Sequence, residues 1–237
     1  MTPSCEGSQL SINRAMRMMQ FADSMFPVGS FSFSNGLESA VAQGIVTGGP
    51  SLREFVLSAA HQGATCDGIA VLAAHRGASD GDFSTILAAD HAVIERKLNE
   101  ESRTMTTRMG KKLAELGGRL VGETLFTKWL AAIETGETPG TYPAGLGIAF
   151  AEMGSPEQDA FTVHQYGVAM TLLGAALRIV RVDHLATQEI LFEVNRTTDG
   201  EYAAVREYGL DDMSNFSPMI DILAAVHVKA HVRMFMN

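Results

Sequence analysis

The stretch SPEQDAFTVHQYGVAMTLLGAALRIVR, residues 155–181, decides the fold. Serine at the N-cap, Pro156 at the first helical position and Gln158 at the third favour a helix start. One helix face then carries Ala160, Val163, Gly167, Met170, Gly174 and Leu177, which recur every three or four residues. Each glycine in a helix interior costs about 1 kcal/mol relative to alanine, so we expect a second helix to approach closely there. The pattern predicts the central helix of the domain.

Helical patterns continue on both sides of this stretch, and strand signals are few. The predicted helices cover residues 11–23, 37–44, 52–62, 68–76, 83–116 with a break near Asn99, 120–133, 147–152, 184–194 and 218–234. Loops or turns are predicted at 77–81, 117–118 and 199–200, and the N-caps at Asn35, Ser51 and Ser155. The sequence therefore predicts an all-α single-domain bundle of about eight to ten helices over residues 11–237, after a flexible N-terminal tail of residues 1–10.

Composition narrows the class of protein. The 237 residues are 46% hydrophobic and 19% charged, as in a globular chain. A formal net charge of -9 disfavours nucleic acid as a partner, because phosphate binding needs clustered Lys and Arg. The apolar run 167–177 is much shorter than the roughly 20 residues of a membrane span, and residues 1–9 lack a secretory signal. Cys5 and Cys66 are too few for a disulfide framework, so we expect a cytoplasmic protein that binds no membrane.

The segment FPVGSFSFSNGLE, residues 26–38, connects the first two predicted helices. It is rich in turn residues and aromatic rings and carries no catalytic group. Loops are where binding residues concentrate, so we interpret it as a contact surface. The alternation of Phe31 and Phe33 predicts one buried and one exposed ring, and Met25 and Phe26 are candidates for exposure.

Four of the 13 methionines, Met16, Met18, Met19 and Met25, cluster just before this segment. Methionine suits adaptable contact surfaces and also fills cores. We favour the core for this cluster and keep the contact surface as the alternative.

Motifs of common enzymes are missing from the sequence. Gly110-Lys111-Lys112 lacks the upstream glycine and the Ser/Thr of a P-loop, and neither a nucleophile elbow nor an HExxH helix occurs. His227 and His231 lie four apart on one face of a predicted helix, a spacing that can bind Zn²⁺ or Ni²⁺. The neighbouring Lys229 and Arg233 favour a polar helix edge instead. A small all-α metal-binding protein or enzyme that uses His227 and His231 stays open as an alternative.

Four segments, in order along nearly the whole chain, resemble the UreF family of urease accessory proteins. They are MQFADSMFPVGSFS at 19–32, the run 101–110 that ends in Met-Gly, Ala175-Ala176-Leu177-Arg178 with Gln188-Glu189-Ile190-Leu191, and Pro218 with Asp221-Ile222, His227 and Arg233-Met234-Phe235. The turn at 181–184 departs from the family pattern, and its role stays open.

The resemblance implies an all-α homodimer with no enzymatic activity and no cofactor. UreF-like chaperones bind a UreD/UreH-type accessory protein and recruit the UreG-type GTPase. The assembly docks on apo-urease and couples GTP hydrolysis to nickel insertion, a task of metalloenzyme maturation linked to nickel cation binding. A helical adaptor with an unrelated client is a further alternative.

The resemblance also suggests which residues bind partners. The expected partner-binding residues are Phe26, Gly29, Phe31, Ser32, Tyr166, Arg178, Gln188, Arg233 and Phe235. Arg233 and Phe235 are expected to form a tail that orders when the UreD-type protein binds. Arg178 could equally be a helix-end charge that stabilises the last carbonyls.

Overall fold

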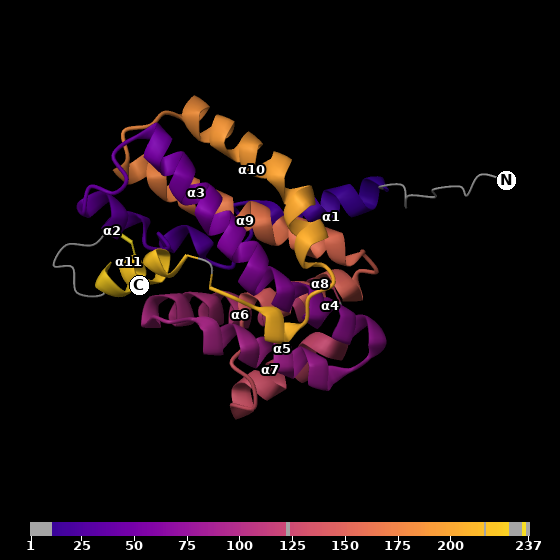
Figure 1. Ribbon diagram of the computed structural model, residues 1–237. Coiled ribbons are helices and arrows are strands. Elements are labelled where there is room, and N and C mark those ends of the chain that lie inside the picture. Colours follow the sequence, from indigo (N-terminus) through magenta and orange to yellow (C-terminus); the bar gives the residue numbers. More distant parts are fainter. Residues whose placement is uncertain (1–10, 122–123, 216, 228–233, 236–237) are drawn as a thin grey trace.

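The computed structural model describes residues 11–121, 124–215, 217–227 and 234–235, and these contain helices and no strand (Figure 1). The α-helices are α1 (Ile12–Ala22), α2 (Leu37–Ala42), α3 (Gly49–Gly63), α4 (Ile69–Asp80), α5 (Phe83–Arg96), α6 (Glu100–Leu120), α7 (Thr124–Thr135), α8 (Tyr142–Glu152), α9 (Glu157–Ile179), α10 (His184–Val205) and α11 (Pro218–His227). Two 3₁₀ turns, η1 (Ser30–Ser32) and η3 (Leu210–Asp212), lie in the connections. The predicted all-α class is confirmed, and the expected tail 1–10 lies outside the described residues.

A π-helical turn, η2 (Ala64–Gly68), joins α3 to α4 without a break in the helical path. The separate helices predicted at 52–62 and 68–76 are therefore one long rod. The Cβ of an alanine at Gly68 would lie 2.7 Å from the Phe161 ring, so this glycine lets α9 cross the rod closely. Single π-helical turns inside longer helices are frequent at functional sites.

Polar side chains begin the helices where the local sequence predicts it. Asn99 caps α6 by accepting a hydrogen bond from the Ser102 amide at 2.8 Å, so the predicted break there is confirmed. Asp183 caps α10 by accepting from the Ala186 amide at 2.8 Å. The turn at 181–184, whose role the resemblance left open, thus starts a helix.

Several predicted helix ends are wrong because small and turn-forming residues lie inside helices here. α4 continues through the loop expected at 77–81 and reaches Asp80. α6 continues through Gly117-Gly118, and α10 continues through Asp199-Gly200 to Val205. α8 begins at Tyr142, before the expected start at 147. Packing of the rest of each helix outweighs the cost of one or two poor helix formers.

Three predicted N-caps are also wrong. Gly36 takes the N-cap position of α2 at φ 79°, and Asn35 before it adopts φ 47°. Ser51 lies in the first turn of α3, where its Oγ accepts from the Thr47 amide at 2.9 Å. Pro156 rather than Ser155 is the N-cap of α9.

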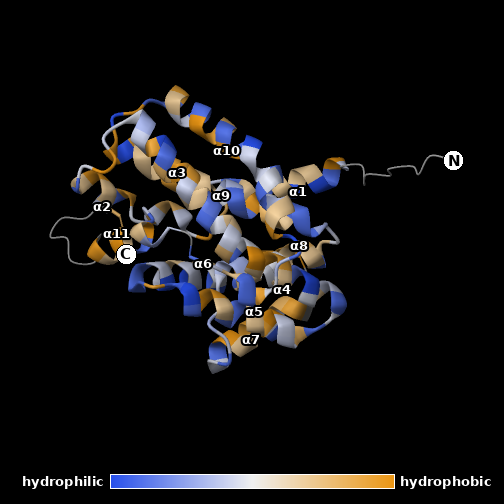
Figure 2. Ribbon diagram, viewed as in Figure 1, coloured by the Kyte–Doolittle hydropathy of each residue, from blue (hydrophilic) through white to orange (hydrophobic). Residues whose placement is uncertain are grey.

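The described residues contain two large hydrophobic clusters. The first lies among α4 to α8 and includes the fully buried Phe126, Trp129 and Phe150. The second lies among α2, α3, α10 and α11 and includes Leu52 and Leu172. α9 takes part in both, which confirms its place at the centre of the fold (Figures 1 and 2).

The glycines of α9 do not serve close helix packing, contrary to expectation. A Cβ added at Gly167 or Gly174 would meet nothing within 4 Å. Close packing occurs at Gly147 instead, where an added Cβ would lie 2.6 Å from the Val71 carbonyl oxygen and 2.8 Å from the His75 amide. This glycine lets α8 lie directly on α4.

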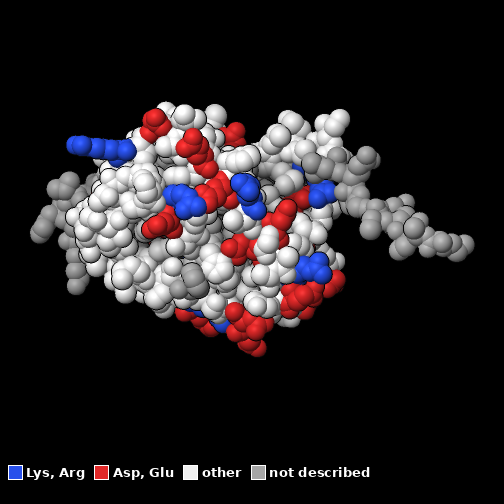
Figure 3. All heavy atoms as spheres, turned by 45° about the horizontal axis from the view of Figure 1, so that its top comes forward, with Lys and Arg blue, Asp and Glu red and all other residues white. Residues whose placement is uncertain are grey.

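Charged residues of both signs lie side by side over the face shown in Figure 3, and a broad area at its left carries neither. Ion pairs link α10 to its neighbours, as between Arg53 of α3 and Glu193. None of the described helices is both long and apolar enough to cross a membrane.

Glu157 holds three helices together and should make stability pH-dependent. Arg76 donates to its two carboxylate oxygens at 2.6 and 2.8 Å, and the Tyr202 hydroxyl donates at 2.9 Å. Burial alone would raise the pKa of Glu157, but these hydrogen bonds hold it below its usual 4.5. Because the folded pKa is the lower one, the stabilisation is present above about pH 4.5 and is lost as pH falls through the folded pKa.

Glu157→Gln should therefore lose part of the stability at neutral pH and little in acid. Urea unfolding of both proteins at pH 6.5 and at pH 3.5 measures this, and we expect a gap of about 1 kcal/mol at pH 6.5 that narrows at pH 3.5. A gap of equal size at both pH values would contradict the assignment. Glu193→Gln, whose carboxylate is more exposed, is the matched control and should show a much smaller difference in stability at either pH.

Candidate partner-binding groove

An open groove with a volume of about 530 Å³ lies between the two hydrophobic clusters. The α1–α2 connection, η2, the start of α6, one face of α9 and α11 contribute its lining. Phe21 and Phe26 line it, with their ring centroids 4.7 Å apart. Gly167 and Gly174 of α9 also line it, so their missing side chains leave the space open.

The aromatic connection at 26–38 forms one rim. Gly29 adopts φ 87°, a left-handed conformation that suits glycine, and directs the chain into η1. Phe31 is 63% exposed and Phe33 is 3% exposed, so the predicted alternation of an exposed and a buried ring is confirmed. Met25 is exposed as expected, but Phe26 is buried against Phe21, so its expected exposure is wrong.

Arg178 connects this rim to the C-terminal segment. Its Nη1 donates to the Phe31 carbonyl oxygen at 3.5 Å, and its guanidinium lies 5.4 Å from the Phe235 ring centroid. Glu38 accepts from the Met234 amide at 2.8 Å and from the Phe235 amide at 3.3 Å. Three of the residues expected to bind partners, Phe31, Arg178 and Phe235, therefore meet at one place.

Phe235 is 4% exposed and packs in the second hydrophobic cluster. A tail that orders only when a partner binds is therefore the wrong description of Phe235, because its ring already fills a site in the chain itself. Arg233, expected to act with it, lies outside the described residues, as does His231. His227 ends α11, and its side chain is likewise outside the description.

Of the other expected residues, Tyr166 and Gln188 lie elsewhere, whereas Ser32 and Gly29 flank Phe31 in the chain. Tyr166 is half-buried against the second cluster, and Gln188 is exposed on α10. Ser32 is half-buried in η1 beside Phe31, while Gly29 lies just before it. Partner binding by any of these residues stays a prediction.

The methionines before the connection do not lie in the core as favoured. Met16 and Met19 are 60% and 65% exposed, whereas Met18 is partly buried against the first cluster. α1 has only one face against the protein, and it places Phe21 and Met18 there. Together with the exposed Ile12, the two methionines form an outward apolar stripe.

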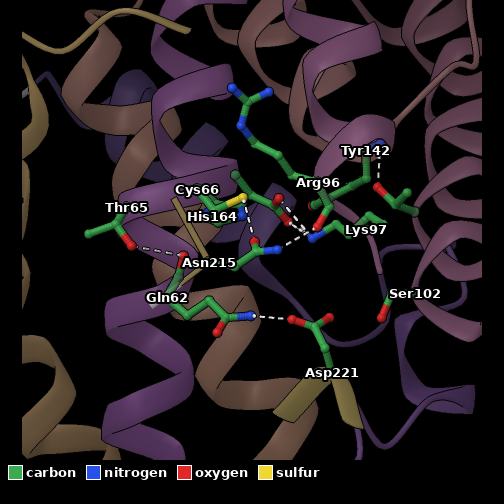
Figure 4. A network of polar contacts seen from close by, with 12 residues as sticks. Gln62, Thr65, Cys66, Arg96, Lys97, Ser102, Tyr142, His164, Asn215 and Asp221 are labelled. Carbon is green, nitrogen blue, oxygen red and sulfur yellow. Dashed lines mark hydrogen bonds and ion pairs between the residues drawn. The ribbon is translucent and has the colours of Figure 1, made fainter. Parts of the chain in front are cut away.

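Polar groups from distant parts of the sequence meet at the groove (Figure 4). Lys97 donates to the two carboxylate oxygens of Asp67 at 2.6 and 2.8 Å, and these side chains are only 15% and 16% exposed. Cys66, His164 and Asp221 also line the groove. Sequence reasoning missed this cluster, because its members are spread from 66 to 221 and no local spacing relates them.

Burial sets the charge states here. It raises the pKa of the Cys66 thiol to about 12, with help from Asp67, so the thiol is a poor nucleophile. It lowers the pKa of His164 and favours the neutral imidazole. Burial also raises the pKa of Asp221, although Lys97 opposes the change.

The arrangement suits binding more than catalysis. Within the part of the chain that the structure describes, no three His, Cys, Asp or Glu side chains form a group that could hold a metal ion. A paired lysine, a neutral thiol and a neutral imidazole provide no activated nucleophile with its base. An apolar groove with polar groups inside it is a typical binding site.

Comparisons with known proteins agree over most of the chain. The family model described as UreF matches residues 46–195. The urease accessory protein UreF 2 of Brucella canis is 53% identical over 230 residues, which cover 97% of this chain and 95% of that protein. The urease accessory protein UreF of Yersinia enterocolitica is 51% identical over 223 residues, which cover 94% of this chain and 97% of that protein. The family match begins after the aromatic connection, but the similarity to these relatives extends over nearly the full length.

Proposed function

Because this chain belongs to the UreF family, whose members are non-catalytic urease accessory proteins, we propose that it is a scaffold for urease maturation. It binds a UreD/UreH-type accessory protein and recruits the UreG-type GTPase. The assembly docks on apo-urease, and GTP hydrolysis is coupled to the insertion of nickel. The scaffold acts as a homodimer in the cytoplasm.

The observation that carries the proposal is the junction of Phe31, Arg178 and Phe235. One arginine contacts two segments that are more than 200 residues apart in sequence (Phe31 and Phe235), next to an open groove. An exposed aromatic ring beside a pinned arginine is typical of residues that dominate binding energy at interfaces. A rigid platform also lowers the entropy cost of association.

Exposed apolar side chains extend this platform along α11. Met219, Ile222 and Val226 are 55%, 54% and 45% exposed and lie on one helix face. The same helix turns Asp221 and Leu223 inward. A helix that exposes an apolar face while it buries an acid is expected where a partner covers that face.

We expect Phe31→Ala to weaken binding of the UreD/UreH-type protein by about 30-fold, because an exposed aromatic anchor is worth about 2 kcal/mol at an interface. The measurement is a titration of the purified partner by calorimetry. Phe192→Ala is the matched control, since Phe192 is 67% exposed on α10, and it should leave the affinity unchanged. Equal effects of the two substitutions would contradict a partner surface at the groove rim.

Size-exclusion chromatography with light scattering tests the scaffold as a whole. The chain alone should elute as a dimer, and a larger stoichiometric complex should form with the UreD/UreH-type and UreG-type proteins and GTP. A chain that remains by itself in every mixture would refute the proposal. Calorimetry with Ni²⁺ and Zn²⁺ on the unmodified chain and on His227→Ala tests the metal-binding alternative. That alternative requires tight binding that the substitution removes.

A further inference from the structure

Asp221 is a buried carboxylate that forms no ion pair among the described residues. It is 7% exposed and lines the groove. Its hydrogen bonds come from two neutral amides, Asn99 Nδ2 at 3.2 Å and Gln62 Nε2 at 3.4 Å. Both distances are at the long end for such bonds, so the negative charge is only partly compensated.

Among the described residues, Lys97 is the cation whose charge acts on Asp221, and it is already paired with another acid. Lys97 donates to both oxygens of Asp67 at 2.6 and 2.8 Å. Two carboxylates and one ammonium therefore share the interior of the groove. A buried charge of this kind is costly unless a counter-charge is supplied, and the groove opening allows one to enter.

The other charged or titratable groups that line the groove do not supply it. His164 is held towards its neutral form by burial, and the Cys66 thiol is protonated. Arg178 is engaged by the Phe31 carbonyl and the Phe235 ring. Asp23 adds a further negative charge to the lining. Among the described residues, the lining has three acids and two bases.

The path to Asp221 is apolar and open. Phe21, Phe26 and Met105 line the groove, and at Gly167 and Gly174 an added Cβ would meet nothing. An aliphatic stem can lie along such a wall while its charged end reaches a polar group. The side chain that combines a flexible four-carbon stem with a compact cation is lysine.

We propose that the groove receives a lysine side chain of the partner protein, with its ammonium against Asp221. This deepens the proposed function, since it rests on a partner at the groove, and it names the chemistry of that partner. The choice of lysine rests on charge complementarity. The partly compensated negative charge in the groove favours a cation, and the apolar walls favour a cation with an aliphatic stem.

The first experiment needs no partner. NMR titration of the full-length chain with n-hexylammonium and with n-hexanol compares a cation with a neutral molecule of the same shape. We expect hexylammonium to bind about tenfold more tightly, the increment of one charge-assisted hydrogen bond, and Asp221→Asn to abolish the difference. Asp199→Asn, exposed on α10, should keep it. Equal binding of the two molecules, or a preference that survives Asp221→Asn, would overturn the proposal.

The second experiment uses the complex with the UreD/UreH-type protein. Asp221→Asn should weaken it about tenfold, and Gly174→Leu, which fills the groove, should weaken it at least as much. Gly200→Leu is the control, because Gly200 is also helical with open space around it but lies on α10. If both variants bind the partner protein with unchanged affinity while the unmodified chain clearly prefers hexylammonium, a lysine of the partner is not the ligand. The site would then bind a free amine. If the unmodified chain does not bind the partner, the scaffold proposal fails. The hexylammonium titration still tests whether Asp221 binds a cation.

Discussion

Replacing Asp90 with alanine should lower the free energy of unfolding by about 4 kcal/mol. Asp90 is fully buried on α5 and accepts four hydrogen bonds. Its donors are Trp129 Nε1 at 3.0 Å, Thr138 Oγ1 at 2.7 Å, and the amides of Gly140 and Thr141 at 3.0 and 2.6 Å. The carboxylate thus holds the connection between α7 and α8, and its loss leaves four donors unpaired in the core.

Urea unfolding followed by circular dichroism measures this effect. Asp90→Asn should be destabilised almost as much, because an amide places a donor where a donor is already present. Asp82→Ala is the matched control, because Asp82 is the exposed N-cap of the same helix, and its loss should cost much less than the loss of Asp90. A loss for Asp90→Ala no larger than for this control would show that the connection is held by other contacts.

Gly110→Ala should cost at least about 3 kcal/mol or prevent folding, since a single methyl group must enter closed packing. An added Cβ would lie 2.5 Å from the Thr141 carbonyl carbon and 2.7 Å from the Tyr142 amide nitrogen, and closer still to the Gly140 carbonyl oxygen. All three are backbone atoms, so no side chain can turn aside. Asp90 accepts hydrogen bonds from the Gly140 and Thr141 amides of the same segment, which leaves the segment little freedom to move.

Gly174→Ala is the same chemical change, but we expect it to stabilise the protein. Gly174 is helical, and an added Cβ would meet nothing within 4 Å. Thermal and urea unfolding should show stabilisation by about 1 kcal/mol, the helix propensity difference between the two residues. If both substitutions destabilised the protein alike, the distinction between closed packing at Gly110 and an open groove at Gly174 would be wrong.

The contrast between these two glycines shows where sequence analysis reaches its limit. Gly174 and Gly167 lie on a periodic small-residue face, from which close helix packing is a reasonable expectation, yet they line the groove. Gly110 has no such context in the sequence and lies where two segments touch. Whether a missing side chain leaves a space or closes one depends on the neighbour, and the neighbour comes from another part of the chain.

Some residues of the candidate site could be predicted from the sequence, and others could not. Phe31 could be recognised from the aromatic connection and from the UreF resemblance, and Arg178 and Phe235 from the resemblance. That these three residues meet at one rim could not be predicted from the sequence. Asp221 appeared only as part of the resemblance, with no role attached to it. Asp67 and Lys97 gave no signal at all, because lysines and aspartates are common on surfaces and only burial makes them unusual.

The sequence by itself determined that this protein is all-α, where most of its helices lie, that Asn99 begins one of them, and which family it resembles. These properties are local or additive: helical periodicity, capping side chains, and motifs read in order along the chain. Only the tertiary structure decided that α3 and α4 are one continuous helical path, that Asp90 holds the 138–141 segment, and that a groove with a partly compensated acid lies between two hydrophobic clusters. Such features depend on contacts between residues tens to hundreds of positions apart, which become neighbours only when the helices pack.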